Sequence, residues 1–132
     1  MDLRLVILAI VVAGAVAAAR GIHRYFSNPP LPRSFDASDV GESGSNPLVV
    51  EFTSPYCLEC EEALPRIKTA AARHNATVAV VDARDRPDLA AKYAIRTTPT
   101  ILVVERGGLV RKGWAHNPPE TELNKALAST VN

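Results

Sequence analysis

The sequence has few residues of the types that build metal sites and disulfide frameworks. Its 132 residues include two cysteines and three histidines. Two cysteines cannot form the several bridges that hold a small secreted domain together, and they supply only half the ligands of a structural zinc site. The histidines, His23, His74 and His116, have no ligand-pair spacing with one another or with the cysteines, so the sequence disfavours a zinc site.

The sequence also lacks an excess of charge of either sign. Fifteen Lys and Arg residues oppose fourteen Asp and Glu residues, so the formal net charge is +1. This balance does not argue for a nucleic acid or an acidic surface as partner. The length predicts a single domain with about ninety residues of globular sequence, which is enough for a modest core.

A long apolar run is present at the N-terminus. Residues 5–19 are uninterrupted and apolar, and Arg4 is the charge nearest the start of the run. The seventeen residues 3–19 would span about 25 Å as a helix, which is close to the minimum for crossing a membrane. We therefore predict a retained transmembrane anchor over residues 1–26. A cleaved signal peptide, with its cleavage site in the alanines at 17–19, and a buried core helix are the alternatives.

The charges beside this run give an orientation signal. Arg20, Arg24 and Arg33 follow the run, whereas Arg4 and the amino terminus precede it and are partly offset by Asp2. By the positive-inside rule, we predict a single-pass protein of the cell membrane whose catalytic domain is cytoplasmic. An extracytoplasmic domain in an oxidising compartment is the alternative.

The run is followed by residues 27–46, which are rich in proline, serine and glycine. We predict that they form a flexible linker with a reach of about 25 Å. A short strand near residues 33–36 is an alternative for part of this segment. The globular domain is predicted over residues 47–132.

Apolar periodicity in this domain predicts alternating strands and helices. Strands are expected over residues 47–53, 76–83, 100–106 and 109–114. Helices are expected over residues 58–74, 87–93 and 118–129. Asp85 and Asn117 are expected to cap the last two helices. The βαβαββα order predicts an α/β sandwich in which a hairpin follows a parallel pair joined through a helix.

Cys57 and Cys60 fall where the first strand ends and the long helix begins. A thiolate at Cys57 would face unpaired backbone N–H groups and the positive end of the helix dipole, which stabilise it. Cys60 lies one turn further on, within reach for a disulfide. We predict that Cys57 is exposed and attacks, while Cys60 is more buried and resolves the mixed disulfide. A metal clip and an inert structural pair are the alternatives.

From Pro47 to about Ser129 the sequence resembles the thioredoxin superfamily. The resemblance rests on "VVEF" before the cysteines, "CLEC" itself, Pro65 in the following helix, "YAIRTTPT" over residues 93–100 and the hairpin that ends in Gly113. It implies a thioredoxin-like fold with a mixed sheet flanked by helices. It also implies a redox-active Cys57–Cys60 disulfide that works without a metal or another cofactor.

The resemblance assigns roles to further residues. Pro99 matches the family's cis-proline that faces the cysteines, and with Thr98 it would present backbone to an extended substrate segment. Tyr56 stands where the family usually has tryptophan, and we expect it to contact substrate. Glu51 matches the family's buried acid beneath the second cysteine, with a raised pKa that suits it to move a proton to or from Cys60. A solvent-exposed glutamate at an edge is the alternative.

The sequence departs from the family pattern at several positions. Val78 stands at the position of the lysine that pairs with the buried acid in classical thioredoxins, so Glu51 has no such partner. Leu58-Glu59 replaces the usual glycine-proline between the cysteines. Residues 27–46 are too few for the strand and helix that come first in the family.

We therefore predict a membrane-tethered thiol–disulfide oxidoreductase that reduces protein disulfides. Its partners would be protein thiols or disulfides and a thiol–disulfide protein that donates or accepts electrons. Glu59, Glu61 and Glu62 would steer basic partners, and a solvated helix face is the alternative for Glu61 and Glu62. The competing hypothesis is a redox-inactive binding or assembly module, because the tryptophan and the central dipeptide are changed. A peroxidase or a transferase is a weaker hypothesis, because the sequence shows no motif for a glutathione or peroxide site.

Overall fold

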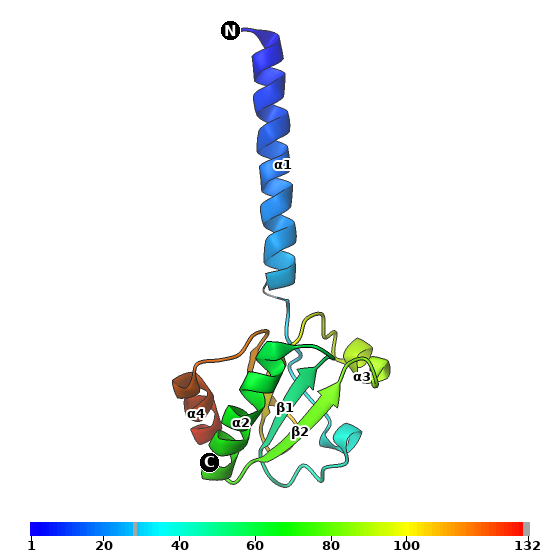
Figure 1. Cartoon of the computed structure of the whole chain (residues 1–132), viewed down its shortest axis with the longest axis vertical. Helices are drawn as coiled ribbons and strands as arrows, with labels where there is room; N and C mark the ends of the chain where they lie inside the picture. Colours follow the sequence, from blue (N-terminus) through cyan, green and yellow to red (C-terminus); the bar gives the residue numbers. More distant parts are fainter. Residues whose placement is uncertain (28, 131–132) are drawn as a thin grey trace.

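The computed structural model describes residues 1–27 and 29–130. They form a four-stranded mixed sheet with helices on both faces, preceded by one long helix (Figure 1). The strands are β1 (Leu48–Thr53), β2 (Thr77–Asp82), β3 (Thr100–Val104) and β4 (Val110–Trp114). The helices are α1 (Leu3–Ser27), the 3-10 turn η1 (Ala37–Val40), α2 (Leu58–Arg73), α3 (Pro87–Lys92) and α4 (Glu120–Ala128).

The sheet has the order β2-β1-β3-β4, with β1 parallel to β2 and antiparallel to β3. β3 and β4 form the predicted hairpin through Gly107 and Gly108, whose φ angles of 89° and 98° favour glycine. The α/β architecture and the order of elements predicted for the domain are confirmed. β1 is a central strand and is buried from Leu48 to Phe52, as its continuous apolar pattern predicts.

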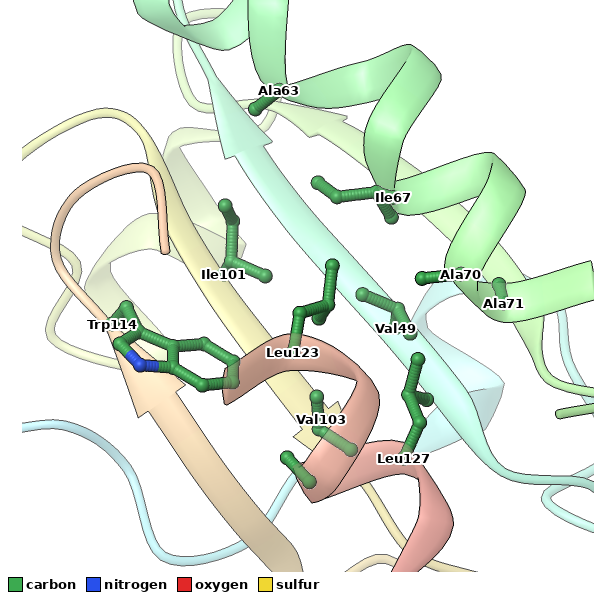
Figure 2. Packing of buried hydrophobic residues seen from close by; sticks show 11 residues of the cluster. Val49, Ala63, Ile67, Ala70, Ala71, Ile101, Val103, Trp114, Leu123 and Leu127 are labelled. Carbon is green, nitrogen blue, oxygen red and sulfur yellow. The ribbon is translucent and has the colours of Figure 1, made fainter. Parts of the chain in front are cut away.

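One face of the sheet packs against α2 and α4. In Figure 2, Ile67 of α2 and Leu123 and Leu127 of α4 gather over Val49 and Val103 of the sheet. Each of these side chains is 2% exposed or less. Removing one large apolar side chain from water stabilises the fold by about 1.5–3 kcal/mol, so this cluster fixes both helices on the sheet.

The opposite face is covered by α3 and by part of the segment that precedes β1. Phe35 is 1% exposed; its ring stacks on Tyr93 at 4.4 Å and meets Phe52 edge to face at 6.3 Å. The Tyr93 hydroxyl donates to Asp39 and accepts from the backbone N–H of Asp36 at 3.0 Å. The segment therefore belongs to the second half of the core.

This packing corrects the prediction for residues 27–46. A flexible linker is wrong for residues 34–40, because they carry a core phenylalanine and a 3-10 turn. The alternative of a short strand is reduced to an isolated antiparallel bridge between Ser34 and Leu109. The physical reason is that one large aromatic ring outweighs the weak propensities of the surrounding Pro, Ser and Gly residues.

The caps of α3 and α4 differ from the prediction, although α3 begins at Pro87 as predicted. Arg86, not Asp85, is the N-cap of α3, because its carbonyl accepts hydrogen bonds from the N–H groups of Leu89 and Ala90. Pro119, not Asn117, precedes α4, and neither start has a side-chain cap. Pro119 has a ψ of 143°, which keeps the chain extended up to the first helical residue.

α1 extends beyond the apolar run on which its prediction rests. Residues Leu3–Phe26 are long and apolar enough to cross a membrane, and the most apolar part of this helix has no buried residues. At 1.5 Å per residue, 24 residues span about 36 Å, against about 30 Å of hydrocarbon in a bilayer. A signal sequence shares this length and composition.

Candidate active site

The turn between β1 and α2 carries both cysteines. Cys57 is the N-cap of α2, and its Sγ accepts a hydrogen bond from the Cys60 N–H at 3.2 Å. The two residues form a disulfide with a Cα–Cα distance of 5.3 Å. Cys60 is 3% exposed, whereas Cys57 is partly exposed. The sulfur nearer to solvent therefore lies at the start of the helix, where the backbone dipoles favour negative charge.

Tyr56 precedes the cysteines in an uncommon backbone conformation. Its φ angle is 63°, in the left-handed region that residues other than glycine seldom adopt. The side chain is 98% exposed. This turn points the aromatic ring into solvent, directly before the more accessible cysteine.

A second loop, between α3 and β3, contains the predicted cis-proline. The Thr98–Pro99 peptide bond is cis, as the resemblance implies. The hydroxyls of Thr98 and Ser54 are 2.7 Å apart and share a hydrogen bond. Because Ser54 lies in the β1–α2 turn, this bond ties the proline loop to the cysteine loop. Nothing in the sequence marks Ser54 for that role, since only the fold brings it to Thr98.

Glu51 lies beneath α2 on the same face of β1 as Val49. It is 1% exposed, so the alternative of a solvent-exposed glutamate is wrong. Burial raises the pKa of its carboxyl to about 7, because the charged form loses its hydration. Among the described residues, its Oε1 has no hydrogen-bond partner. The site therefore holds a carboxyl that can change its protonation state near neutral pH.

The strand register corrects the assignment of the neighbour of this acid. Glu51 pairs with Val80 of β2, whereas Val78 pairs with Val49. The residue beside the acid is therefore Val80, two positions further along than the predicted Val78. The conclusion that a valine stands beside the acid is unchanged, and Val80 is 47% exposed at the edge of the sheet.

No group of three or more His, Cys, Asp or Glu side chains is placed to hold a metal ion within residues 1–27 and 29–130. The arrangement consists of a dithiol–disulfide pair, a buried acid and an adjoining proline loop. Such a set can exchange a disulfide with another molecule and move the associated proton.

Comparisons with known proteins agree with this geometry. The sequence model of the Thioredoxin family matches residues 33–129. A thioredoxin of Pyropia yezoensis is 33% identical over 101 residues, covering 74% of this chain and 90% of that protein. The protein disulfide isomerase-like 2-3 of Oryza sativa subsp. japonica is 35% identical over 104 residues, which is 23% of its length.

Solved structures show the same architecture. A mutant thioredoxin from Halobacterium salinarum NRC-1 has a TM-score of 0.64 at 23% identity, and the match covers 80% of this chain and 94% of that one. This likeness shows the fold. The family relatives and the Cys57–Cys60 disulfide support thiol–disulfide oxidoreductase chemistry at a general level. By its family match, its relatives and its fold, this chain belongs to the thioredoxin family.

Proposed function

We propose that this chain is a membrane-tethered thiol–disulfide oxidoreductase that reduces disulfides in other proteins. The observation that carries the proposal is the Cys57–Cys60 disulfide at the start of α2, on the sheet face that buries an unpaired Glu51 with a pKa of about 7. A pKa near neutrality suits a group that accepts and returns a proton in each cycle. An inert structural disulfide has no use for such a group.

Reduction begins when the Cys57 thiolate attacks one sulfur of a substrate disulfide. A bond forms between Cys57 and the substrate, the substrate S–S bond breaks, and its other sulfur leaves as a thiolate. Cys60 then passes its proton to Glu51 and attacks the Cys57 sulfur, which releases the substrate's second thiolate. Two electrons pass from the cysteine pair to the substrate, and a reducing thiol protein restores the pair.

Three residues serve the substrate in this proposal. Thr98 and Pro99 offer backbone to an extended segment beside the cysteines, in the manner of strand addition. Tyr56 lies directly before Cys57 with its ring in solvent, where it can contact the same segment. The Ser54–Thr98 hydrogen bond holds the cysteine loop and the proline loop together.

The test of the chemistry compares two cysteine variants on a disulfide-bonded peptide. We expect Cys57→Ser to reduce the peptide only at the uncatalysed rate and Cys60→Ser to accumulate a mixed disulfide with it. Lys68→Ala, on an exposed position of α2, is the matched control and should keep the full rate. Undiminished reduction by Cys57→Ser would overturn the proposed mechanism, and the absence of a trapped adduct with Cys60→Ser would favour the redox-inactive binding module.

The direction of electron flow is tested by the reduction potential of the pair. A reductase predicts a value near −270 mV, like that of reducing thioredoxins, when the protein is equilibrated with dithiothreitol buffers. A value of about −120 to −180 mV would contradict the reductase and indicate an oxidant or isomerase.

The tether is α1, with the domain in the cytoplasm. The apolar length of Leu3–Phe26 supports the anchor, and the arginines that follow the apolar run support the orientation. The full chain should remain in the membrane fraction after an alkaline wash, and its domain should resist protease added outside intact cells. A soluble form shortened by the N-terminal segment would show a cleaved signal peptide instead.

A further inference from the structure

α1 leaves the domain at the end that carries the cysteines. In Figure 1 the C-terminal end of β1 and the start of α2 lie at the side of the domain where α1 departs. The Arg96 guanidinium lies over the Tyr25 ring at 4.1 Å, which joins the last turn of α1 to the proline loop. Thr98 follows Arg96 by only two residues. The active site is therefore attached to the base of the helix.

The chain is fixed to the domain again just after α1. Pro29 is buried, and Leu31 fills the space beside Gly113, where a Cβ atom would stand 2.8 Å from Leu31 Cδ1. The six residue-to-residue steps from Tyr25 to Leu31 can span at most about 20 Å. The domain therefore cannot move far from the end of the helix.

The most exposed apolar side chains of the domain lie at this same end. Within residues 29–130, the two most exposed large apolar side chains are Tyr56 at 98% and Leu58 at 73%. They flank Cys57 in the sequence. Tyr25 and Phe26, at 51% and 56%, are exposed at the base of α1. Aromatic residues favour the membrane–water interface, and exposed apolar groups beside a reactive sulfur indicate an apolar partner.

Simple lengths place the site near the bilayer. Arg20 ends the apolar run, and Tyr25 lies five residues later, about 7.5 Å along the helix. From the Tyr25 ring it is 4.1 Å to Arg96, and two residues reach at most about 7 Å further to Thr98. The Tyr25 and Arg96 side chains add about 6 Å each between these points, so the substrate-binding loop lies within about 30 Å of the hydrocarbon boundary.

We propose that the substrates of this site are disulfides in membrane proteins, located in the segments directly beside their membrane spans. This inference rests on the proposed function, including the tether. Such segments carry Lys, Arg and interfacial aromatic residues. The exposed Tyr56 and Leu58 fit their apolar part, and the exposed Glu59, Glu61 and Glu62 at the start of α2 fit their positive charge.

The test uses the full chain, reduced beforehand, in vesicles of phosphatidylcholine and phosphatidylglycerol. One probe is a transmembrane peptide with a disulfide loop at the bilayer surface. A second probe carries the same loop on a spacer of fifteen prolines, about 45 Å higher. The third is the same loop on a soluble peptide. The measured quantity is the rate at which each probe is reduced.

We expect the surface probe to react about tenfold faster than the raised probe, because confinement to the right height raises its effective concentration. Equal rates, or faster reduction of the raised probe, would overturn the inference while reduction of the soluble peptide left the proposed chemistry intact. No reduction of any probe would overturn the proposed function and the inference together.

Three variants test whether the junction sets this preference. Inserting twenty glycine and serine residues after Phe26 releases the domain by on the order of 25 Å and should abolish the preference. Tyr25→Leu removes the ring from Arg96 and should lower the preference about threefold, whereas Tyr25→Phe keeps the ring and should retain it. The soluble peptide should be reduced equally by all three variants. A preference unchanged by the insertion would contradict the inference.

Discussion

Helices α2 and α4 cover one face of the sheet, whereas α3 and the segment before β1 cover the other. Each face holds a carboxyl group close to the core. On the α2 side Glu51 is buried without a partner at Oε1, and its pKa is raised to about 7. On the α3 side the pKa of Asp39 is lowered, because Lys92 and Tyr93 both donate hydrogen bonds to it.

This difference between the two carboxyl groups indicates that the α2 face serves the reaction, whereas the α3 face serves stability. Proteins usually pair their buried polar groups, because an unpaired one costs about 1–3 kcal/mol. Asp39 is partly exposed and paired, and it helps to hold η1 against α3. Glu51 breaks that rule on the face where the disulfide lies, which is expected where a group must change its charge during a reaction.

The largest effect is expected from Phe35→Ala. Removing this buried ring should lower the free energy of unfolding by about 3–5 kcal/mol. Ile67→Ala, on the other face, should cost about 2–5 kcal/mol and is the matched comparison. Urea unfolding of both variants measures these losses. A change within about 0.5 kcal/mol for Phe35→Ala would mean that the segment behaves as a free linker after all.

Glu51→Gln should change how stability depends on pH. The folded pKa of about 7 lies above the ordinary value of 4.5, so the folded state holds a proton that the unfolded state has lost between these pH values. The stability of the parent chain should therefore fall as pH rises from about 4.5 through 7, by about 3 kcal/mol in all.

The variant has no such group and should keep its stability across this window. Both proteins are measured with the Cys57–Cys60 disulfide formed, so that no thiol titrates. Parallel curves of unfolding free energy from pH 5 to pH 8 would show that Glu51 does not titrate near 7.

Val80→Lys should supply the missing partner of the acid. Val80 pairs with Glu51 and is partly exposed, so a lysine there can keep its ammonium group near water and approach the carboxylate. The pKa of Glu51 should fall by about 1 unit or more. Val78→Lys is the matched control; it pairs with Val49 and should lower this pKa less. The carboxyl pKa is read by NMR titration, and a larger fall with Val78→Lys would contradict the register.

Tyr93→Phe should have the smallest effect. It keeps the ring that stacks on Phe35 and removes the hydroxyl that bonds Asp39 and the Asp36 N–H. We expect a loss of about 1 kcal/mol in unfolding free energy and a rise in the pKa of Asp39. An unchanged Asp39 pKa would mean that Lys92 alone sets it.

The elements that the sequence predicts well are those whose signals are local. The apolar runs of β1 and β3 and the helical spacing of α2 depend on nearby residues, and Cys57 sits at a helix start for the same reason. The predicted caps of α3 and α4 are wrong, although α3 begins at Pro87 as predicted. Asp85 and Asn117 have side chains that suit a cap. However, Asp85 lies in a turn with Asp82, and Pro118 and Pro119 separate Asn117 from the first residue of α4.

Contacts between residues far apart in sequence are not predicted by local patterns. Phe35 is a single aromatic residue in a polar segment, so no periodicity reveals that it stacks on Tyr93. Ser54 and Thr98 are both small hydroxyl residues, and their hydrogen bond depends on two loops meeting. The sequence places Val78 beside the acid instead of Val80, because both valines point to the same face of β2 and only the strand register distinguishes them.

The sequence by itself determined the α/β order, the position of the cysteines at a helix start and the presence of an acid in an apolar strand, because each depends on neighbouring residues. The tertiary structure decided which side chain borders that acid, which residues close the second face of the sheet and where the active site lies relative to α1. Those properties arise when distant segments pack, and the burial that raises the pKa of Glu51 exists only after they have done so.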